Sequence, residues 1–323
     1  AEIDVDRLRA ERMASTTFRS DAAYEAAEPY ELIETGMPPA PVMSLSRAVS
    51  PLPFVPKGSM LEENCQEIFN IQVTGLATRL AHARAKTAVI GVSGGLDSTL
   101  ALLVCAKTFD RLDLPRKGII GVTMPGFGTT DRTYQNALTL MKNLGVTVRE
   151  VDITQACRQH FCDIGHDEKN KDITYENTQA RERTQVLMDI ANQTGGLVIG
   201  TGDLSELALG WATYNGDHMS MYGVNAGVPK TLVRSLVAWA AQHETGKKTQ
   251  AVLADIVDTP ISPELLPAAE NGVISQKTED LVGPYELHDF FLFYFLRYGF
   301  GPAKIYFLAK QAFDKKFAPG VIK

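Results

Sequence analysis

A nine-residue segment, GVSGGLDST at positions 91–99, constrains the fold more than any other part of this sequence. It lies between two apolar runs, residues 88–90 and residues 100–104. Adjacent glycines let a backbone turn sharply without side-chain clash, and short apolar runs on either side are typical of a buried strand and a helix. We therefore predict a strand–loop–helix unit whose loop closes the carboxyl end of the strand.

The same alternation of strand and helix continues along the chain. Helices are predicted over 61–84, 97–109, 132–144 and 176–193, with another beginning at 204, and strands over 87–92, 118–124, 146–153 and 197–201. Strands that alternate with helices form a parallel sheet covered on both faces. The predicted fold class is therefore α/β, a doubly wound parallel sheet with helices on both faces, followed by a mainly helical part from residue 229.

The first 60 residues have a different character. Residues 1–18 predict a strand followed by a short basic helix. Residues 19–60 predict an extended connector, because proline removes a backbone donor and is excluded from helix interiors. The prolines concerned are Pro29, Pro38, Pro39, Pro41, Pro51, Pro53 and Pro56.

Charge and cysteine content exclude several classes of protein. A net charge of -6 argues against a nucleic-acid partner, and no apolar run reaches the ~20 residues of a membrane span. Four cysteines in 323 residues do not make a disulfide scaffold, which favours a reducing compartment, the cytoplasm. Cys157, His160, Cys162 and His166 lack the paired, separated ligands of a zinc module and are interpreted as core and surface residues.

The loop itself predicts a phosphate site. Ligands of doubly wound sheets bind beyond the carboxyl ends of the strands, where Gly94 and Gly95 allow backbone N–H groups to face a ligand. The helix N-terminus adds partial positive charge, and Ser93 and Ser98 add hydroxyl donors. Asp97 does not favour a bare phosphate, so we interpret it as a magnesium ligand. The loop lacks the lysine of a Walker A motif and the spaced glycines of a dinucleotide fingerprint.

A second polar block covers residues 175–217. On its predicted helix, Asn177, Arg181 and Gln185 recur every four residues and share one face, which suits a carboxylate or phosphate but is equally compatible with a solvated surface. The next strand ends in Gly-Thr-Gly-Asp at 200–203, and Glu206 follows one turn into a helix. A carboxylate there can complete a magnesium shell with Asp97, although Asp203 is also a suitable helix N-cap.

Two levels of family resemblance follow from these residues. SGG-x-D-S after a buried strand resembles the pyrophosphate loop of the ATP pyrophosphatase (PP-loop) superfamily, whose Rossmann-like fold is called adenine nucleotide alpha-hydrolase-like. The block YENTQARERTQVLMDIANQTGGLVIGTGDLSELALGWATYNGD together with GVNAGVPKTLV (223–233) resembles NAD synthetase, in particular the synthetase half of glutamine-dependent enzymes. The resemblance implies ATP- and Mg²⁺-dependent amidation of deamido-NAD to NAD+ through a nicotinate adenylate, with release of AMP and pyrophosphate.

The resemblance also implies roles for individual residues. It assigns Asp97 and Lys230 to catalysis and Asp97 and Glu206 to the metal. It assigns ATP binding to Gly91, Val92, Ser93, Gly94, Gly95, Leu96, Asp97, Ser98, Thr201, Lys230 and Ser262. It assigns deamido-NAD binding to Asn177, Arg181, Glu206, Trp211, Ala212, Thr213, Tyr214 and Asp217.

The resemblance implies a domain organisation as well. Residues 1–18 resemble the C-terminal tail of a missing nitrilase-like amidase, residues 19–60 a proline-rich linker, and residues 61–323 a synthetase domain truncated at its C-terminus. Such a chain is expected to use free ammonia, whereas the full-length parent takes it from glutamine. The aromatic stretch 289–300 is expected in the core or at a subunit interface, since family synthetase domains form homodimers or higher homo-oligomers.

Two other functions stay open from the sequence. One is another PP-loop ligase or amidotransferase, such as an enzyme that makes GMP or asparagine. The other is an adenine-nucleotide-binding module without catalysis. Release of pyrophosphate separates the second from the first, and the acid that drives this release separates the ligases from one another.

Overall fold

A computed structural model describes residues 3–18, 33, 45–243, 245–259 and 278–323 of the chain. These residues form two compact units, one made of residues 55–285 and the other of residues 1–54 with 286–323. The larger unit contains the sheet and the predicted loop. The domain boundaries expected from the sequence stay predictions.

Five strands in the described residues form one parallel sheet in the order β3-β2-β1-β4-β5. They are β1 (Ala88–Gly91), β2 (Ile119–Thr123), β3 (Thr147–Glu150), β4 (Leu197–Gly200) and β5 (Tyr222–Gly223). Strand β1 is central, with Val89 in register with Ile120 of β2 and with Val198 of β4. The chain therefore leaves β1 at the middle of the sheet, between the ends of β2 and β4.

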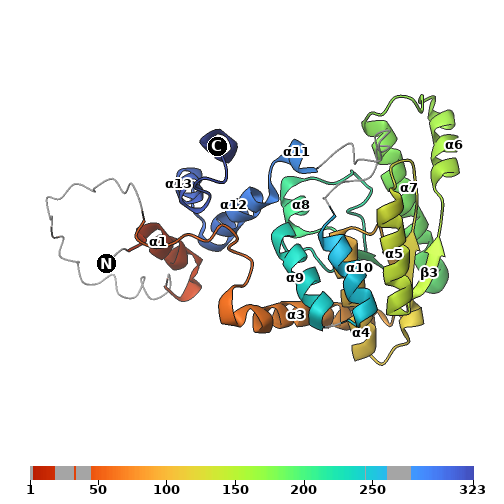
Figure 1. The fold of residues 1–323 in the computed structure, drawn as a ribbon, viewed down its shortest axis with the longest axis horizontal. Helices are drawn as coiled ribbons and strands as arrows, with labels where there is room; N and C mark the ends of the chain where they lie inside the picture. The colour runs from red at the N-terminus through yellow and green to blue at the C-terminus, as the bar shows by residue number, and fades with distance from the viewer. Residues whose placement is uncertain (1–2, 19–32, 34–44, 244, 260–277) are drawn as a thin grey trace. The chain divides into compact units, whose positions relative to one another are not determined.

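Helices cover both faces of this sheet (Figure 1). The larger unit contains α3 (Leu61–Ala83), α4 (Leu96–Arg111), α5 (Asp131–Leu144), α6 (Thr154–Ile164), α7 (Ile173–Thr194), α8 (Leu204–Leu209), α9 (Lys230–His243), α10 (Lys247–Val257) and α11 (Thr278–Val282). Its described residues also form two short 3₁₀ turns, Gly58–Met60 and Arg116–Gly118. The predicted doubly wound α/β fold is confirmed.

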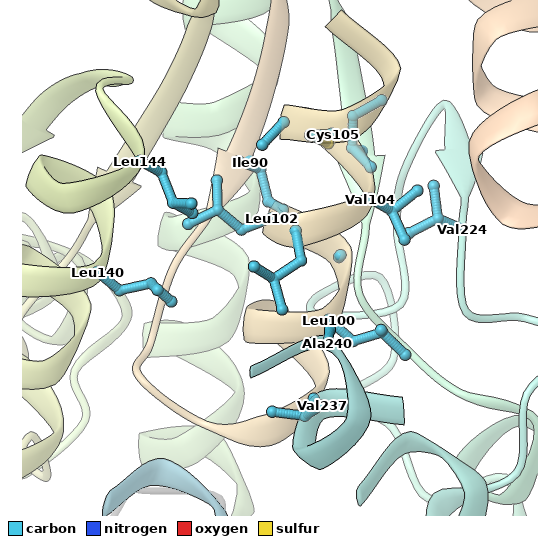
Figure 2. Packing of buried hydrophobic residues seen from close by; sticks show 14 of the residues in the cluster. Ile90, Leu100, Leu102, Val104, Cys105, Leu140, Leu144, Val224, Val237 and Ala240 are labelled. Carbon is cyan, nitrogen blue, oxygen red and sulfur yellow. The ribbon is translucent and has the colours of Figure 1, made fainter. Parts of the chain in front are cut away.

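The larger core lies on the face covered by α3, α4, α5, α9 and α10. Ile90 of β1 points into it, where it is buried with Leu100 and Leu102 of α4 and with Val237 of α9 (Figure 2). Helix α4 is buried around most of its circumference, because α3 and α9 both pack against it. The start of α4, which follows the glycine loop, is thus anchored in the larger core.

The opposite face carries a smaller core formed with α6 and α7. Val89, the neighbour of Ile90 in β1, lies here with Val122, Phe161 and Tyr175. Successive residues of a strand point to opposite faces, so a strand buried on both sides is apolar throughout, as residues 88–90 are.

Three local features differ from the sequence prediction. Residues 3 and 4 are not a strand, since Asp4 is the N-cap of α1 (Val5–Ala14). Helix α6 was not predicted, because a short polar segment with two buried residues, Cys157 and Phe161, gives little periodicity. Strand β5 has two residues and gives no readable pattern.

The smaller unit contains α1, α12 from residue 286 onward (helix Tyr285–Tyr298), α13 (Pro302–Ala312) and α14 (Pro319–Ile322). Its core is aromatic: Phe290 lies 4.7 Å from Tyr294 and 5.3 Å from Phe313, between ring centroids. Much of the aromatic stretch 289–300 is thus core, while Phe295 is exposed. None of the helices in the described part of the chain is long and apolar enough to cross a lipid bilayer.

Candidate active site

The glycine loop follows β1 and enters α4. Gly94 has φ +87°, and a Cβ atom built on it would lie 2.2 Å from the carbonyl oxygen of Thr133 in α5. Only glycine therefore fits this position. The Ser93 hydroxyl accepts the Gly95 N–H at 3.2 Å, and the Ser98 hydroxyl donates to the Gly95 carbonyl at 3.2 Å. The loop is held by its own serines and by α5 behind it.

The N-terminus of α4 opens at this loop. Its N-cap, Gly95, has no side chain with which to accept the first N–H groups of the helix. Because those N–H groups and the helix dipole favour negative charge, the loop and α4 suit an anion, with the Ser93 and Ser98 hydroxyls only 3.3 Å apart beside it.

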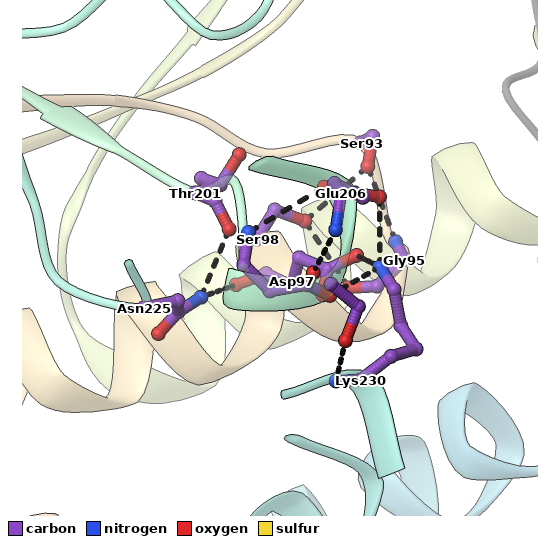
Figure 3. A network of polar contacts seen from close by, with 10 residues as sticks. Ser93, Gly95, Asp97, Ser98, Thr201, Glu206, Asn225 and Lys230 are labelled. Atoms are coloured by element: carbon purple, nitrogen blue, oxygen red, sulfur yellow. Dashed lines mark hydrogen bonds and ion pairs between the residues drawn. The ribbon is translucent and has the colours of Figure 1, made fainter. Parts of the chain in front are cut away.

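One lysine joins three carboxylates next to this loop (Figure 3). Lys230 Nζ lies 2.6 Å from Asp97 Oδ2, 2.7 Å from Asp203 Oδ2 and 2.8 Å from Glu206 Oε1. Asp97 comes from the first turn of α4, Asp203 and Glu206 from the start of α8, and Lys230 from the start of α9. We call these four residues the acidic cluster. Ends of neighbouring parallel strands meet at one sheet edge, so the fold brings together residues 133 positions apart.

Local structure fixes the members contributed by α8 and α9. Asp203 and Glu206 form a capping box, in which Asp203 Oδ1 accepts the Glu206 N–H at 2.8 Å. The Lys230 N–H donates to the Ser205 hydroxyl at 2.9 Å, which ties the start of α9 to α8. The side chain of Lys230 is 2% exposed and that of Asp203 is fully buried.

Burial and neighbouring charge shift the pKa values of three members of the acidic cluster. Burial, followed by the nearby carboxylates, raises the pKa of Asp203 to about 8 and also raises the pKa of Glu206. Burial alone would lower the pKa of Lys230, but Asp97, Glu206 and Asp203 raise it well above its usual value. Three carboxylates against one ammonium leave an excess of negative charge when all are ionised.

This arrangement fits a divalent cation. One oxygen each of Asp97, Asp203 and Glu206 lies within 4.8 Å of the others, a spacing at which a single ion can bind all three. Asp97 Oδ1 is buried and has no hydrogen-bond partner among the described residues, so one ligand atom stays available. Carboxylate oxygens are the ligands that Mg²⁺ prefers. The donor set therefore supports a magnesium site.

A second group of polar residues lies on α7 and the loop after α8. Arg181 Nε donates to the Tyr214 carbonyl at 3.1 Å, and the Thr213 N–H donates to Asp217 Oδ1 at 2.7 Å. The Trp211 N–H donates to the Glu206 carbonyl at 2.9 Å, so this loop begins where the helix of the acidic cluster ends. Tyr214 is 73% exposed, and its side chain is accessible to a ligand.

The structure thus brings the predicted residues into two groups. Asp97, Glu206 and Lys230 meet in the acidic cluster, next to the loop residues 91–98 and to Thr201 at the end of β4. Arg181, Trp211, Ala212, Thr213, Tyr214 and Asp217 form the second group, and Asn177 is half-buried on α7, one turn before Arg181. Ser262 lies outside the described residues.

Sequence reasoning missed two residues of the first group. Asp203 was considered as a carboxylate at this strand end and as a helix cap but was not assigned to the site, and it both caps α8 and pairs with Lys230. Asn225 was not singled out, yet its side-chain amide donates to the carbonyls of Asp97 and Thr201. The signal available in the sequence was an asparagine within an otherwise small and apolar stretch, GVNAGV.

Comparisons with known proteins agree on one family. The family model described as NAD synthase matches residues 68–296. The glutamine-dependent NAD(+) synthetase of Mycobacterium tuberculosis (strain ATCC 25618 / H37Rv) is 47% identical over 324 residues, which cover 97% of this chain and 47% of that protein. The enzyme of the same name from Thermotoga maritima is 31% identical over 265 residues, covering 81% of this chain and 43% of its own length. The chain spans about half the length of these curated relatives.

Solved structures agree on the fold. The NMN synthetase of Francisella tularensis is 25% identical with a TM-score of 0.59, and the match covers 79% of this chain and 96% of that one. A glutamine-dependent NAD+ synthetase from Acinetobacter baumannii, solved in complex with ADP, is 24% identical with a TM-score of 0.54 and covers 79% of this chain and 42% of its own. At this identity the second likeness shows the fold alone.

Proposed function

Because this chain belongs to the NAD synthase family, we propose that it carries out the synthetase reaction of a glutamine-dependent NAD+ synthetase. It amidates the nicotinate carboxylate of deamido-NAD with ammonia and consumes ATP, which makes it a ligase that forms a C–N bond. The products are NAD+, AMP and pyrophosphate. The single observation that carries this proposal is the acidic cluster, in which Lys230 joins a carboxylate at the start of α4 to two carboxylates at the neighbouring strand end.

The reaction needs two steps, because a carboxylate is a poor electrophile. In the first step, an oxygen of the nicotinate carboxylate attacks the α-phosphorus of ATP, and the bond to the β-phosphate oxygen breaks with release of pyrophosphate. In the second step, ammonia attacks the acyl carbon of the adenylate, AMP leaves with the bonding electrons, and the nitrogen loses a proton to solvent or phosphate. No side chain need act as covalent nucleophile.

The glycine loop holds the departing pyrophosphate. The N–H groups at the start of α4 and the Ser93 hydroxyl donate hydrogen bonds to the β- and γ-phosphates, whose charge they stabilise, and the Ser98 hydroxyl joins them by turning its proton from the Gly95 carbonyl to the phosphate. Gly94 keeps the backbone close to α5 and leaves the ligand side of the loop free of a side chain. Thr201 adds a polar group at the neighbouring strand end.

Charge is the main barrier of the first step, because an anionic carboxylate approaches an anionic phosphate. Lys230, buried and held ionised by its carboxylate neighbours, supplies positive charge at this point. Asp97 and Glu206, with Asp203 beside them, would hold Mg²⁺, which screens the phosphate charges when bound. Each charge-assisted hydrogen bond to phosphate contributes about 1.5–3 kcal/mol.

The second group of polar residues binds deamido-NAD. Arg181 provides a guanidinium for its carboxylate or phosphates, and Asn177 lies one turn away on α7. Tyr214 and Trp211 offer aromatic surface for a base or the nicotinate ring, in a loop fixed by Asp217. Because the loop continues from α8, substrate binding is connected directly to Glu206.

The wider context of the reaction is also a proposal. Residues 1–18 correspond to the tail of an amidase domain, 19–60 to a linker and 61–323 to the synthetase domain, and the complete protein takes ammonia from glutamine. The four cysteines are free, which is consistent with a cytoplasmic location. A homodimer or a higher homo-oligomer through the synthetase domain, and no nucleic-acid or membrane partner, complete the proposal.

The test is incubation of the chain with ATP, Mg²⁺, ammonium and one acid at a time, following AMP, pyrophosphate and NAD+. Deamido-NAD should drive equal release of all three products. Nicotinate mononucleotide is the informative rival acid, since a neighbour in structure is named an NMN synthetase. If xanthosine monophosphate or aspartate drove pyrophosphate release and deamido-NAD did not, the chain would be another PP-loop ligase; nucleotide binding without any release would indicate a binding module.

A further inference from the structure

We propose that Asn225 is the positioning residue that sets the placement of the two phosphate-facing strand ends relative to each other. This inference rests on the proposed function and adds a residue to it. Asn225 is not a member of the acidic cluster. It acts through the backbone of the glycine loop's helix and of the segment after β4.

The contacts of Asn225 join segments from three parts of the chain. Its Nδ2 atom donates to the carbonyl of Asp97 at 2.9 Å and to the carbonyl of Thr201 at 3.0 Å (Figure 3). Asp97 lies in the first turn of α4, after β1, while Thr201 follows β4, and Asn225 itself follows β5. One amide group therefore connects the ends of three neighbouring strands on the edge where ligands of this fold bind.

A second buried amide fixes the orientation of the first. Gln72 of α3 donates from Nε2 to Asn225 Oδ1 at 3.0 Å and to the Val224 carbonyl at 2.9 Å. Backbone carbonyls only accept hydrogen bonds, so the NH₂ group of Asn225 must face Asp97 and Thr201, and its oxygen must face Gln72. Asn225 is fully buried, and Gln72 is 7% exposed.

The carbonyls that Asn225 binds belong to peptides whose N–H groups face the other way. In a trans peptide the C=O and N–H bonds point in opposite directions. Holding the Thr201 carbonyl therefore directs the Gly202 N–H away from Asn225, and holding the Asp97 carbonyl does the same for the Ser98 N–H. The carbonyl oxygens of Asp97 and Thr201 would repel a phosphate. Asn225 holds both of them on its own side, so that the N–H groups of Ser98 and Gly202 face the opposite side.

The position tolerates few replacements. Alanine would leave the Thr201 carbonyl without this donor and would remove the link between α4 and the segment after β4, so the two ends could separate. Aspartate has the same shape but would place carboxylate oxygen against two carbonyl oxygens. The sequence around Asn225 offers no other amide for this purpose, since its neighbours are Val224 and Ala226.

The test measures binding of ATP with Mg²⁺, and of pyrophosphate, to the whole chain by calorimetry. Asn225→Ala should raise the Kd of both by about tenfold, because misplaced loop donors lose roughly one charge-assisted hydrogen bond. It should leave the KM for deamido-NAD within about twofold of wild type. This split between ligands would not arise from a general loss of stability, which affects both sites alike.

Thr108→Val is the matched control. Thr108 is fully buried near the far end of α4, where its hydroxyl donates to the Val104 carbonyl at 2.7 Å and to the Val73 carbonyl of α3 at 3.4 Å. It also links α3 and α4, but away from the glycine loop. We expect Thr108→Val to lower the melting temperature and to leave the Kd of ATP unchanged.

Three outcomes decide the proposal. If Asn225→Ala folds and binds ATP and pyrophosphate as wild type does, the positioning role is wrong, whether or not NAD+ is formed. A second outcome combines weak binding by the variant with an inactive wild type. If Asn225→Ala no longer binds ATP and pyrophosphate, and the wild type binds both but forms no NAD+ from deamido-NAD, the positioning role holds and the proposed function fails. Should Asn225→Ala not fold, Gln72→Met decides instead, because it frees the orientation of Asn225: a rise of about threefold in the Kd of ATP supports the proposal, and no change overturns it.

Discussion

The ammonium nitrogen of Lys230 lies 2.6 Å from Oδ2 of Asp97, although α9 and the start of α4 are far apart in the sequence. The same nitrogen also contacts Asp203 and Glu206. Without a bound cation, Lys230 supplies the positive charge next to the three carboxylates, so the lysine and a metal ion would act on the same carboxylate groups. Because Lys230 and the metal ion both depend on these carboxylates, measurements of stability with and without Mg²⁺ can test the cluster without following the reaction.

Lys230→Met should destabilise the metal-free protein by about 3 kcal/mol, because it leaves buried carboxylates without their partner. It should also abolish pyrophosphate release. Saturating Mg²⁺ should then raise the melting temperature of the variant more than that of wild type, since the ion replaces the missing positive charge. Thermal melts with and without Mg²⁺ measure both effects.

The control for this prediction is Lys304→Met in the smaller unit. Lys304 also contacts two carboxylates, Asp4 and Asp6, but these are side chains of the surface helix α1 and its N-cap. No gain in melting temperature from Mg²⁺ is expected there. An equal Mg²⁺ effect on both variants would mean that the ion does not bind the acidic cluster.

Gly94→Ala should lower the free energy of unfolding far more than Gly145→Ala does. Both glycines have positive φ, which costs alanine about 1–2 kcal/mol. A Cβ at Gly94 also meets the Thr133 carbonyl at 2.2 Å, whereas nothing lies within 4 Å of one at Gly145. Overpacking adds about 1–3 kcal/mol at Gly94 and displaces the loop, so pyrophosphate release should be lost there alone. Equal denaturant midpoints for the two variants would contradict this packing.

The stability of the metal-free protein should depend on pH through Asp203. Its pKa is raised from 3.8 to about 8 by burial, so between these values the folded state keeps a proton that the unfolded chain has lost. The stability contribution therefore falls as pH rises from about 4 to about 8, by at most about 1.4 kcal/mol per pH unit. Asp203→Asn preserves a good N-cap and does not titrate.

The difference between Asp203→Asn and wild type isolates this group. The stability of the variant relative to wild type should increase across that pH range in urea titrations. Saturating Mg²⁺ should flatten the difference, because it favours the ionised carboxylate of wild type. A difference that does not change with pH would show that Asp203 stays ionised throughout.

Arg181→Met should raise the KM for deamido-NAD by about 10- to 100-fold, the loss expected for one charge-assisted contact. The Kd of ATP should stay within about twofold of wild type, since the glycine loop is unaffected. Gln185→Met, one turn later on α7, is the matched control and should change neither constant. A rise in the Kd of ATP alone would place Arg181 at the nucleotide instead.

Much of the fold was predictable because parallel sheets have a strong sequence signature. Runs such as residues 88–90 are apolar throughout since both faces are covered, and Gly145 marks the end of α5 with its left-handed backbone. The rule that ligands lie at carboxyl ends of strands was enough to bring Asp97 and Glu206 together. Helix α6 was missed because it has only two buried residues, and strand β5 because it is only two residues long. Neither gives a hydrophobic periodicity that can be recognised in the sequence.

The parts of the site that escaped prediction depend on tertiary contact. Asp203 has a complete local explanation as an N-cap, so nothing in the sequence points to its pairing with Lys230. Asn225 donates to backbone carbonyls of residues 128 and 24 positions away. Every residue has a backbone carbonyl, so the sequence does not mark these two as its partners. Such roles become visible only when the strand ends have been placed side by side.

The most direct test of the whole account is a crystal structure of the chain with a non-hydrolysable ATP analogue and Mg²⁺. We expect the β- and γ-phosphates to lie against residues 93–98, within hydrogen-bond distance of the loop N–H groups, with the metal on Asp97 and Glu206. A triphosphate bound elsewhere, with this loop empty, would contradict it.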